Sequence, residues 1–379
     1  MTSNLFSPLR MGSVELDNRI VVAPMCQYSA NDGCASDWHL MNLMQLAVSG
    51  AGLVMLEATA VERHGRITHG CLGLYSDVTE VALGRVMAAA RGVGQGVRWG
   101  IQLGHAGRKA SAQRPWEGRG ALGEGEDPWQ TQGPSALAFT NGWHTPQAMT
   151  KDDIRRVRDS FVDSAKRAAR LGFEVVEIHA AHGYLLHQFL SPLANQRDDE
   201  YGGSLAKRMR LPLDIAAAVR DALGADIALG FRITGTDWKD GGITIDECVA
   251  FTEALKAVGV DYVCVTSGAV APAAIPVEPG YQVHLAEEVK RRTGMVTRAV
   301  GFIADPHQAE AILANQQADC VALGRAFIDD PRWPWHAAEV LGDVNRIRYP
   351  GQYERGGAQL WPGVALRQKK RRCVMKACP

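Results

Sequence analysis

Two histidines and a tyrosine stand within six residues of one another in this sequence. His179, His182 and Tyr184 follow an apolar run, residues 173–178, that is typical of a buried strand. Two neutral imidazoles can each donate an N–H to one oxygen, and a phenol nearby can supply a proton. These groups would stabilise a carbonyl oxygen as it becomes an enolate and would then protonate the neighbouring carbon.

Other interpretations of these three residues remain open. Two histidines three positions apart could be zinc ligands, although no third ligand at a suitable spacing is evident. Either histidine could be a structural residue, and Tyr184 could pack in the core, where its hydroxyl would still need a hydrogen-bond partner. The occurrence of all three at the end of one strand favours the catalytic interpretation.

Eight apolar runs, each followed by a helical pattern, predict a (β/α)8 TIM barrel. Asp77 and Thr244 resemble helix N-caps, and Asp305 precedes a proline at a first helical position. A doubly wound sheet is the alternative, but the glycine-rich turn that usually opens such a sheet does not follow the first run. The runs are residues 19–25, 53–61, 98–105, 174–182, 227–234, 262–268, 295–302 and 320–327.

Two segments exceed what a barrel needs. Residues 107–149 are rich in glycine, proline and tryptophan and predict a long loop after the third strand, and residues beyond 335 form a C-terminal extension. No linker divides the chain. We therefore expect a single TIM-barrel domain over residues 1–356 and a basic, disordered tail over residues 357–379.

Composition excludes several classes of protein. Of the 379 residues, 46% are hydrophobic and 22% charged, as in ordinary globular proteins. The 41 Lys and Arg residues are balanced by 41 Asp and Glu residues. This balance of charge argues against a nucleic-acid partner. No apolar run approaches the roughly 20 residues that span a bilayer, and the first residues do not resemble a signal peptide. Eight scattered cysteines predict reduced thiols and a cytoplasmic protein.

The run from His179 to Tyr184, continued by residues 185–192 and 195–204, resembles the Old Yellow Enzyme family of FMN-dependent ene-reductases. The resemblance implies that NADPH reduces FMN and that flavin N5 then gives hydride to an α,β-unsaturated carbonyl or nitro compound. It implies that His179 and His182 bind the carbonyl or nitro oxygen and that Tyr184 protonates the α-carbon. The preference for NADPH rests on this resemblance alone.

The expected flavin site extends over several strand ends. TIM barrels often hold a phosphate between the loops after strands seven and eight, where glycines admit the backbone to an anion. A cation such as Arg232 near the flavin ring would stabilise the anionic reduced flavin, although an internal ion pair is the alternative. The resemblance implies non-covalent FMN contacts from Pro24, Met25, Cys26, Ala60, Gln102, Arg232, Gly301, Gly324 and Arg325.

Cys26 and Tyr28 resemble the thermophilic-like branch of the family. There a cysteine lies at the flavin ring edge and a tyrosine lines the substrate site; the alternative for Cys26 is a small buried apolar residue. The motif over residues 352–356 implies that Arg355 enters the substrate site of a partner subunit in a homodimer or a dimer of dimers. The closing tryptophan of that branch is replaced by Gly357.

Two competing functions are less well supported. Longer relatives that act on dienoyl-CoA or amines carry a cysteine cluster for an iron–sulfur centre, whereas only Cys373 and Cys378 follow the eighth run here. A non-catalytic flavin sensor would not need the two histidines and the tyrosine. We therefore expect an NADPH-dependent ene-reductase that acts on small activated alkenes, without a metal and without membrane partners.

Overall fold

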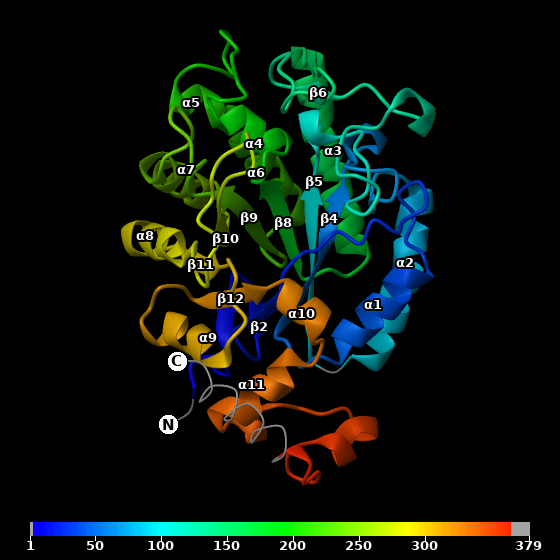
Figure 1. Ribbon diagram of the computed structural model, residues 1–379, viewed down its shortest axis with the longest axis vertical. Helices are drawn as coiled ribbons and strands as arrows, with labels where there is room; N and C mark the ends of the chain where they lie inside the picture. The colour runs from blue at the N-terminus through cyan, green and yellow to red at the C-terminus, as the bar shows by residue number, and fades with distance from the viewer. Residues whose placement is uncertain (1–2, 95, 365–379) are drawn as a thin grey trace.

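Eight parallel strands close into a barrel in the computed structural model, which describes residues 3–94 and 96–364 (Figure 1). Their order around the barrel follows the order of the chain. The predicted (β/α)8 TIM barrel is confirmed, and each strand begins within the apolar run predicted for it. The strands are β3 (Ile20–Val22), β4 (Leu53–Ala60), β5 (Arg98–Gly104), β8 (Val175–Ala180), β9 (Ala228–Thr234), β10 (Tyr262–Thr266), β11 (Val296–Ala299) and β12 (Cys320–Leu323).

A helix follows each strand and packs on the outside of the barrel. In the third of these helices, Ile154, Val157 and Phe161 are buried at helical spacing, so one apolar face covers the sheet. Thr244 and Asp305 cap their helices as predicted, but the second helix begins after Ser76 and not after Asp77. The main helices are α1 (Asp37–Ala47), α2 (Asp77–Val93), α3 (Lys151–Arg170), α6 (Arg210–Leu223), α7 (Ile245–Ala257), α8 (Val283–Thr293), α9 (Pro306–Ala314) and α11 (Trp333–Leu341).

The barrel interior contains a fully buried polar network. Glu177 accepts hydrogen bonds from the Tyr262 hydroxyl at 2.9 Å and from Gln102 Nε2 at 2.7 Å, and it pairs with the Arg298 guanidinium. Removing either partner would leave the other charge buried and uncompensated, which is costly, so the two groups depend on each other. Gly230 leaves room for this network, because a Cβ there would lie 2.1 Å from the Tyr262 ring.

A hairpin that the sequence did not indicate covers the amino-terminal end of the barrel. Its strands are β1 (Leu9–Met11) and β2 (Val14–Leu16), which pair antiparallel. Met11 and Leu16 are buried and pack with barrel residues such as Val21 and Leu53. The hairpin therefore excludes water from the end of the barrel opposite the loops that follow the strands.

The insertions contribute short elements around the opposite end and after the barrel. Residues 107–149 carry η2 (Gly107–Lys109), η3 (Glu124–Glu126), β6 (Gln132–Gly133) and β7 (Gln147–Ala148), and the loop after β8 carries α4 (Leu185–Leu190) and α5 (Leu205–Arg208). Three further elements, α10 (Arg325–Asp329), η4 (Val344–Arg346) and η5 (Gly351–Gly356), lie in the C-terminal part, and η1 (Arg63–Gly65) follows β4. No helix in the described residues is both long and apolar enough to cross a membrane.

The predicted tail falls partly outside the described residues. Residues 357–364 are placed, and there Gln359 donates a hydrogen bond to Asn345 and Val364 is buried. The basic stretch over residues 367–373 lies in the part of the chain that the structure does not describe.

Candidate active site

The predicted site residues gather at the carboxyl ends of the barrel strands. His179 lies near the end of β8 and is in register with Arg232 on β9. Gln102 lies on β5, in register with Glu177 of β8, and Cys26 follows β3. Because all strands of the barrel are parallel, these side chains share one end of the molecule, where TIM barrels carry their active sites.

The turn between His182 and Tyr184 has an unusual backbone. His182 and Gly183 both have positive φ angles, of 57° and 72°. A Cβ at position 183 would lie 2.1 Å from the carbonyl oxygen of Ala269, so only glycine fits there. The turn places the ring centroids of His182 and Tyr184 5.1 and 5.0 Å from that of His179. The three residues that the sequence singled out are thus brought together.

Burial keeps this trio uncharged. It lowers the pKa of His179 and His182 well below the usual value, and the nearby Arg232 cation lowers them further. Burial raises the pKa of the Tyr184 phenol well above its usual value. At neutral pH the site therefore holds two neutral imidazoles and a protonated phenol, as donors and a general acid require.

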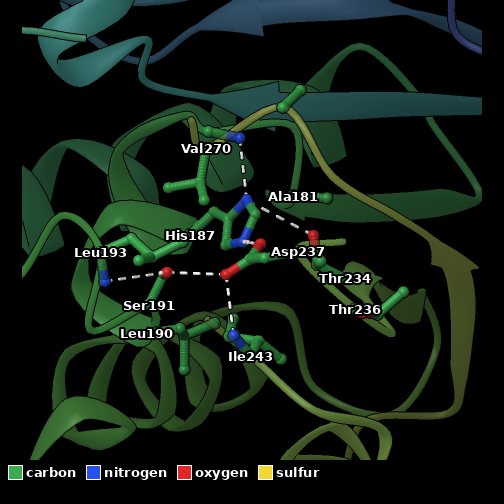
Figure 2. Close-up of polar contacts among 12 residues, drawn as sticks. Ala181, His187, Leu190, Ser191, Leu193, Thr234, Thr236, Asp237, Ile243 and Val270 are labelled. Carbon is green, nitrogen blue, oxygen red and sulfur yellow. Dashed lines mark hydrogen bonds and ion pairs between the residues drawn. The ribbon is translucent and has the colours of Figure 1, made fainter. Parts of the chain in front are cut away.

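A buried histidine–aspartate pair supports this turn (Figure 2). His187 Nδ1 accepts the N–H of Gly183 at 2.8 Å, so the imidazole proton resides on Nε2, which donates to Asp237 at 2.9 Å. The second carboxylate oxygen of Asp237 accepts from the Ser191 hydroxyl and the Ile243 N–H. Although burial favours the neutral acid, these contacts hold the pKa of Asp237 below its usual value.

A cation from the long insertion also holds the turn of the site in place. Lys109 Nζ donates to the carbonyl oxygens of His182 at 2.9 Å and Ala269 at 3.1 Å, and it lies 5.3 Å from the Tyr184 ring centroid. Burial, followed by the neighbouring Arg108 cation, lowers the pKa of Lys109 to about 8. Sequence reasoning missed Lys109, because no motif marks it within a loop rich in glycine and proline.

The loop after β3 is held by a buried carboxylate. Glu57 accepts the N–H of Gln27 at 2.9 Å and lies 3.2 Å from the His39 imidazole. This contact fixes the segment between Cys26 and Tyr28, which is half-buried. Burial raises the pKa of the Cys26 thiol well above its usual value, so the sulfur is an uncharged S–H group at neutral pH.

Arg232 has the environment expected of a group that awaits an anionic ligand. Its Nε atom is buried without a hydrogen-bond partner, and no carboxylate within residues 3–94 and 96–364 forms an ion pair with it. The alternative of an internal ion pair therefore has no support in these residues. Gln102, by contrast, has its amide group fixed by Glu177, which leaves its carbonyl oxygen to accept a further bond.

The remaining predicted flavin contacts lie at adjacent strand ends. Gly301 has a φ of 118°, and a Cβ there would lie 2.8 Å from the Gln282 amide nitrogen. A Cβ on Gly324 would lie 3.4 Å from Met25 Sδ, so the ends of β12 and β3 approach closely at these residues. Ala60 is buried at the end of β4. Pro24 is half-buried, and Arg325 is exposed. These positions together could hold a flavin across the mouth of the barrel.

Arg355 does not lie beside the trio of its own chain. It belongs to η5 and is exposed. In Figure 1 the η5 segment, in the orange-red part of the chain, is at the lower edge of the view, whereas α4 is in the upper half. The η5 segment packs on α11 through the ring contact of Tyr353 with Trp335.

The described residues contain no group of three histidine, cysteine, aspartate or glutamate side chains that could hold a metal ion. The described residues therefore offer no third ligand for a zinc ion bound by His179 and His182. Within the same residues, the free thiols are those of Cys26, Cys34, Cys71, Cys248, Cys264 and Cys320.

Comparison with known proteins agrees with this fold. Residues 4–343 match the NADH:flavin oxidoreductase / NADH oxidase family. An NADPH dehydrogenase of Geobacillus thermodenitrificans is 42% identical over 358 residues, which cover 94% of this chain and 99% of the relative. An NADPH dehydrogenase of Listeria monocytogenes is 41% identical over 355 residues, which cover 93% of this chain and 99% of the relative. The structure of morphinone reductase superposes with a TM-score of 0.75 at 28% identity, covering 90% of each chain.

The fold and these matches define a flavin-dependent TIM-barrel oxidoreductase. The chain belongs to the NADH:flavin oxidoreductase / NADH oxidase family, and the resemblance to Old Yellow Enzyme is confirmed. It is an enzyme that uses FMN and a nicotinamide cofactor. The buried, unpartnered Nε of Arg232 and the glycines at positions 301 and 324 fit such a flavin.

Proposed function

We propose that the protein is an NADPH-dependent ene-reductase that reduces the C=C bond of α,β-unsaturated carbonyl or nitro compounds. The observation that carries this proposal is the convergence of His179, His182 and Tyr184, all uncharged, at the carboxyl end of β8. Bound FMN would supply the hydride. The two histidines would bind the substrate oxygen, and Tyr184 would deliver the proton to the α-carbon.

The electrostatics of the site support these roles. As negative charge develops on the substrate oxygen, N–H donors already in place stabilise it without reorganisation. A phenol with a raised pKa remains protonated until the carbanion-like carbon forms beside it. Arg232, Gln102, Gly301, Gly324 and Arg325, with Pro24, Met25, Cys26 and Ala60, would hold the flavin, and Tyr28 would line the substrate side.

Two further properties are part of the proposal. We propose a homodimer, or a dimer of dimers, in which Arg355 enters the partner's site; the exposure of Arg355 supports this arrangement. We propose a cytoplasmic location, which the free thiols among the described cysteines support, because secreted proteins commonly oxidise theirs.

The function is tested by separating the two halves of the reaction. The purified holoenzyme is bleached anaerobically with NADPH and then mixed with a cyclic enone. Recovery of the oxidised flavin spectrum, together with formation of the saturated ketone, is the expected result. A reduced enzyme that returns to the oxidised state only with oxygen, and with no enone, maleimide or nitroalkene, would contradict the proposal.

A further inference from the structure

Glu57, on β4, is a buried carboxylate that holds the loop carrying Cys26. One of its oxygens, Oε2, accepts the N–H of Gln27 at 2.9 Å, and Gln27 directly follows Cys26 in the chain. The other oxygen, Oε1, lies 3.2 Å from Nε2 of the buried His39. The carboxylate is therefore fixed beside the loop that presents the thiol to the site.

The surroundings of Glu57 favour its ionised form. His39 Nδ1 accepts the N–H of Ser36 at 3.0 Å, so the proton of the neutral ring resides on Nε2, the nitrogen that faces Glu57. Each carboxylate oxygen thus faces an N–H group and needs no proton of its own. A cavity of about 20 Å³ adjoins Glu57, His39 and Gln27 and has room for one water molecule, which would hydrate the charge.

The Cys26 thiol lies among groups that oppose its ionisation. Burial is the main cause of its raised pKa, and Cys71 and the Glu57 carboxylate raise it further, whereas the Arg232 cation lowers it. Cys71 is itself an uncharged thiol, since burial raises its pKa as well. The negative charge that acts on Cys26 among these groups therefore comes from Glu57.

The phenols near Cys26 add no charge of their own. Burial raises the pKa of both Tyr28 and Tyr184 above the usual value, so both are protonated at neutral pH. The ionisation of Cys26 therefore depends on the balance between two charges of opposite sign, those of Glu57 and Arg232.

The ionisation of this thiol matters because of the ligands that the site would receive. An activated alkene is an electrophile to which a thiolate can add. In that reaction the sulfur bonds to the β-carbon, the π bond of the alkene breaks, and the α-carbon takes a proton from water. The thiol form is not the nucleophile. A thiolate at position 26 would therefore be consumed by the compounds that the enzyme is proposed to reduce.

We propose that Glu57 is a positioning residue whose negative charge keeps Cys26 in the thiol form and so protects the site from covalent addition of activated alkenes. Removing the proton from Cys26 would place a second anion near the carboxylate, in a buried region where like charges interact strongly. This inference rests on the proposed function, because such protection has a purpose only if the ligands are activated alkenes.

Alkylation by N-ethylmaleimide, itself an activated alkene, tests this inference in the oxidised holoenzyme without NADPH. The rate at Cys26 is followed by mass spectrometry of its peptide at one mildly alkaline pH. Glu57→Gln and Glu57→Met both remove the anion, and we expect the rate at Cys26 to rise by about three- to thirtyfold in each. The rate at Cys34, another half-buried thiol in the same sample, should not change. Either neutral variant suffices if the other fails to fold.

Glu57→Asp separates the effect of charge from that of shape. Aspartate keeps the anion on a shorter side chain, so the rate at Cys26 should remain close to that of the unaltered enzyme. If Glu57→Asp reacted as fast as the neutral variants, the position of the loop and not the charge would govern Cys26. Neutral variants that react no faster than the unaltered enzyme would equally overturn the proposal.

The pH dependence of alkylation in the unaltered enzyme needs no variant. Because the rate follows the fraction of thiolate, it should rise about tenfold per pH unit at Cys26 across the mildly alkaline range. A rate that levels off at or below about pH 8.5, the range of an ordinary thiol, would overturn the proposal. None of these measurements requires turnover. A protein that shows these effects and yet reduces no alkene would refute the proposed function alone.

Discussion

His187 and Asp237 form a hydrogen-bonded pair with no solvent exposure, and their nearest atoms are 2.9 Å apart. Neither residue belongs to the trio, but the pair fixes the acceptor that holds Gly183, the residue between His182 and Tyr184. The geometry of the trio thus depends on which nitrogen of His187 carries the proton.

Asp237→Asn should slow alkene reduction while leaving the fold and the flavin content intact. Ser191 and Ile243 both donate to one oxygen of this side chain, so the asparagine must keep its carbonyl oxygen there. The NH2 group of the asparagine would then face His187 Nε2. His187 would then carry its proton on Nδ1, opposite the N–H of Gly183. A misplacement of about 1 Å can cost on the order of 100-fold in rate, and we expect a loss of about 10- to 100-fold.

Steady-state kinetics of Asp237→Asn, with urea unfolding in parallel, tests this effect. Asp246→Asn is the matched control, because it makes the same change at an exposed carboxylate paired with Arg292 on the surface. An Asp237→Asn enzyme as fast as the control would show that the His187 tautomer does not govern the site.

Tyr184→Phe should separate the two half-reactions. The phenol would deliver a proton to carbon, which alkene reduction needs and flavin reduction by NADPH does not. A positioned general acid contributes roughly 10²–10⁴ in rate, so enone reduction should slow by that order. Stopped-flow measurement should find flavin reduction within a few-fold of the unaltered enzyme. Equal slowing of both half-reactions would remove Tyr184 from the role of proton donor.

Lys109 should impose a pH dependence on alkene reduction. Its pKa is lowered to about 8, so the ammonium is present below that pH and is lost as the pH rises through it. The cation near the Tyr184 ring would stabilise the phenolate that remains after proton transfer. The rate of flavin reoxidation by an enone should therefore fall several-fold above about pH 8. Lys109→Met should be slower and show no such break; a break that persists in this variant would belong to another group.

Cys26→Ala should shift the flavin potential without unfolding the protein. The uncharged thiol is half-buried beside the expected flavin edge, and one weak hydrogen bond corresponds to a shift on the order of 10–30 mV. Cys248→Ala is the control, because it removes a buried thiol from α7, on the outside of the barrel. If potentiometric titration gave the same flavin reduction potential for both variants, the interpretation of Cys26 as a packing residue would be supported.

The barrel could be predicted from the sequence because its strands are continuous apolar runs buried on both faces. The predicted runs were longer than the strands where an apolar stretch continued into the next element. The run over residues 320–327, for example, includes β12, which ends at Leu323, and the start of α10 at Arg325. The β1–β2 hairpin was missed because three-residue strands leave too few residues for an alternating pattern.

The residue pattern by itself predicted the site where its residues adjoin in sequence, whereas the flavin contacts on separate strands were expected from the family resemblance. His179, His182 and Tyr184 form one motif, and their meeting is a local consequence of the turn. Lys109 lies 73 residues from His182 along the chain, and Asp237 lies 50 residues from His187. Both reach the turn from other loops, through contacts that have no sequence signature.

Gly183→Ala should damage both stability and activity by a steric mechanism. Alanine would have to adopt a φ of 72°, and its Cβ would lie 2.1 Å from the Ala269 carbonyl oxygen. Gly203→Ala would also place alanine at a positive φ, since Gly203 has a φ of 82°. A methyl group at position 203 would, however, meet nothing within 4 Å. The left-handed conformation alone costs alanine about 1–2 kcal/mol, so Gly203→Ala should lower the free energy of unfolding by about that much and leave turnover unchanged. Gly183→Ala should cost more in urea unfolding, because the backbone of the turn must move away from Ala269, and enone reduction should fall by at least about tenfold, on the order expected for a misplaced trio. If the two variants lost equal stability and kept equal activity, the close approach of Gly183 to Ala269 would not be what fixes the catalytic turn.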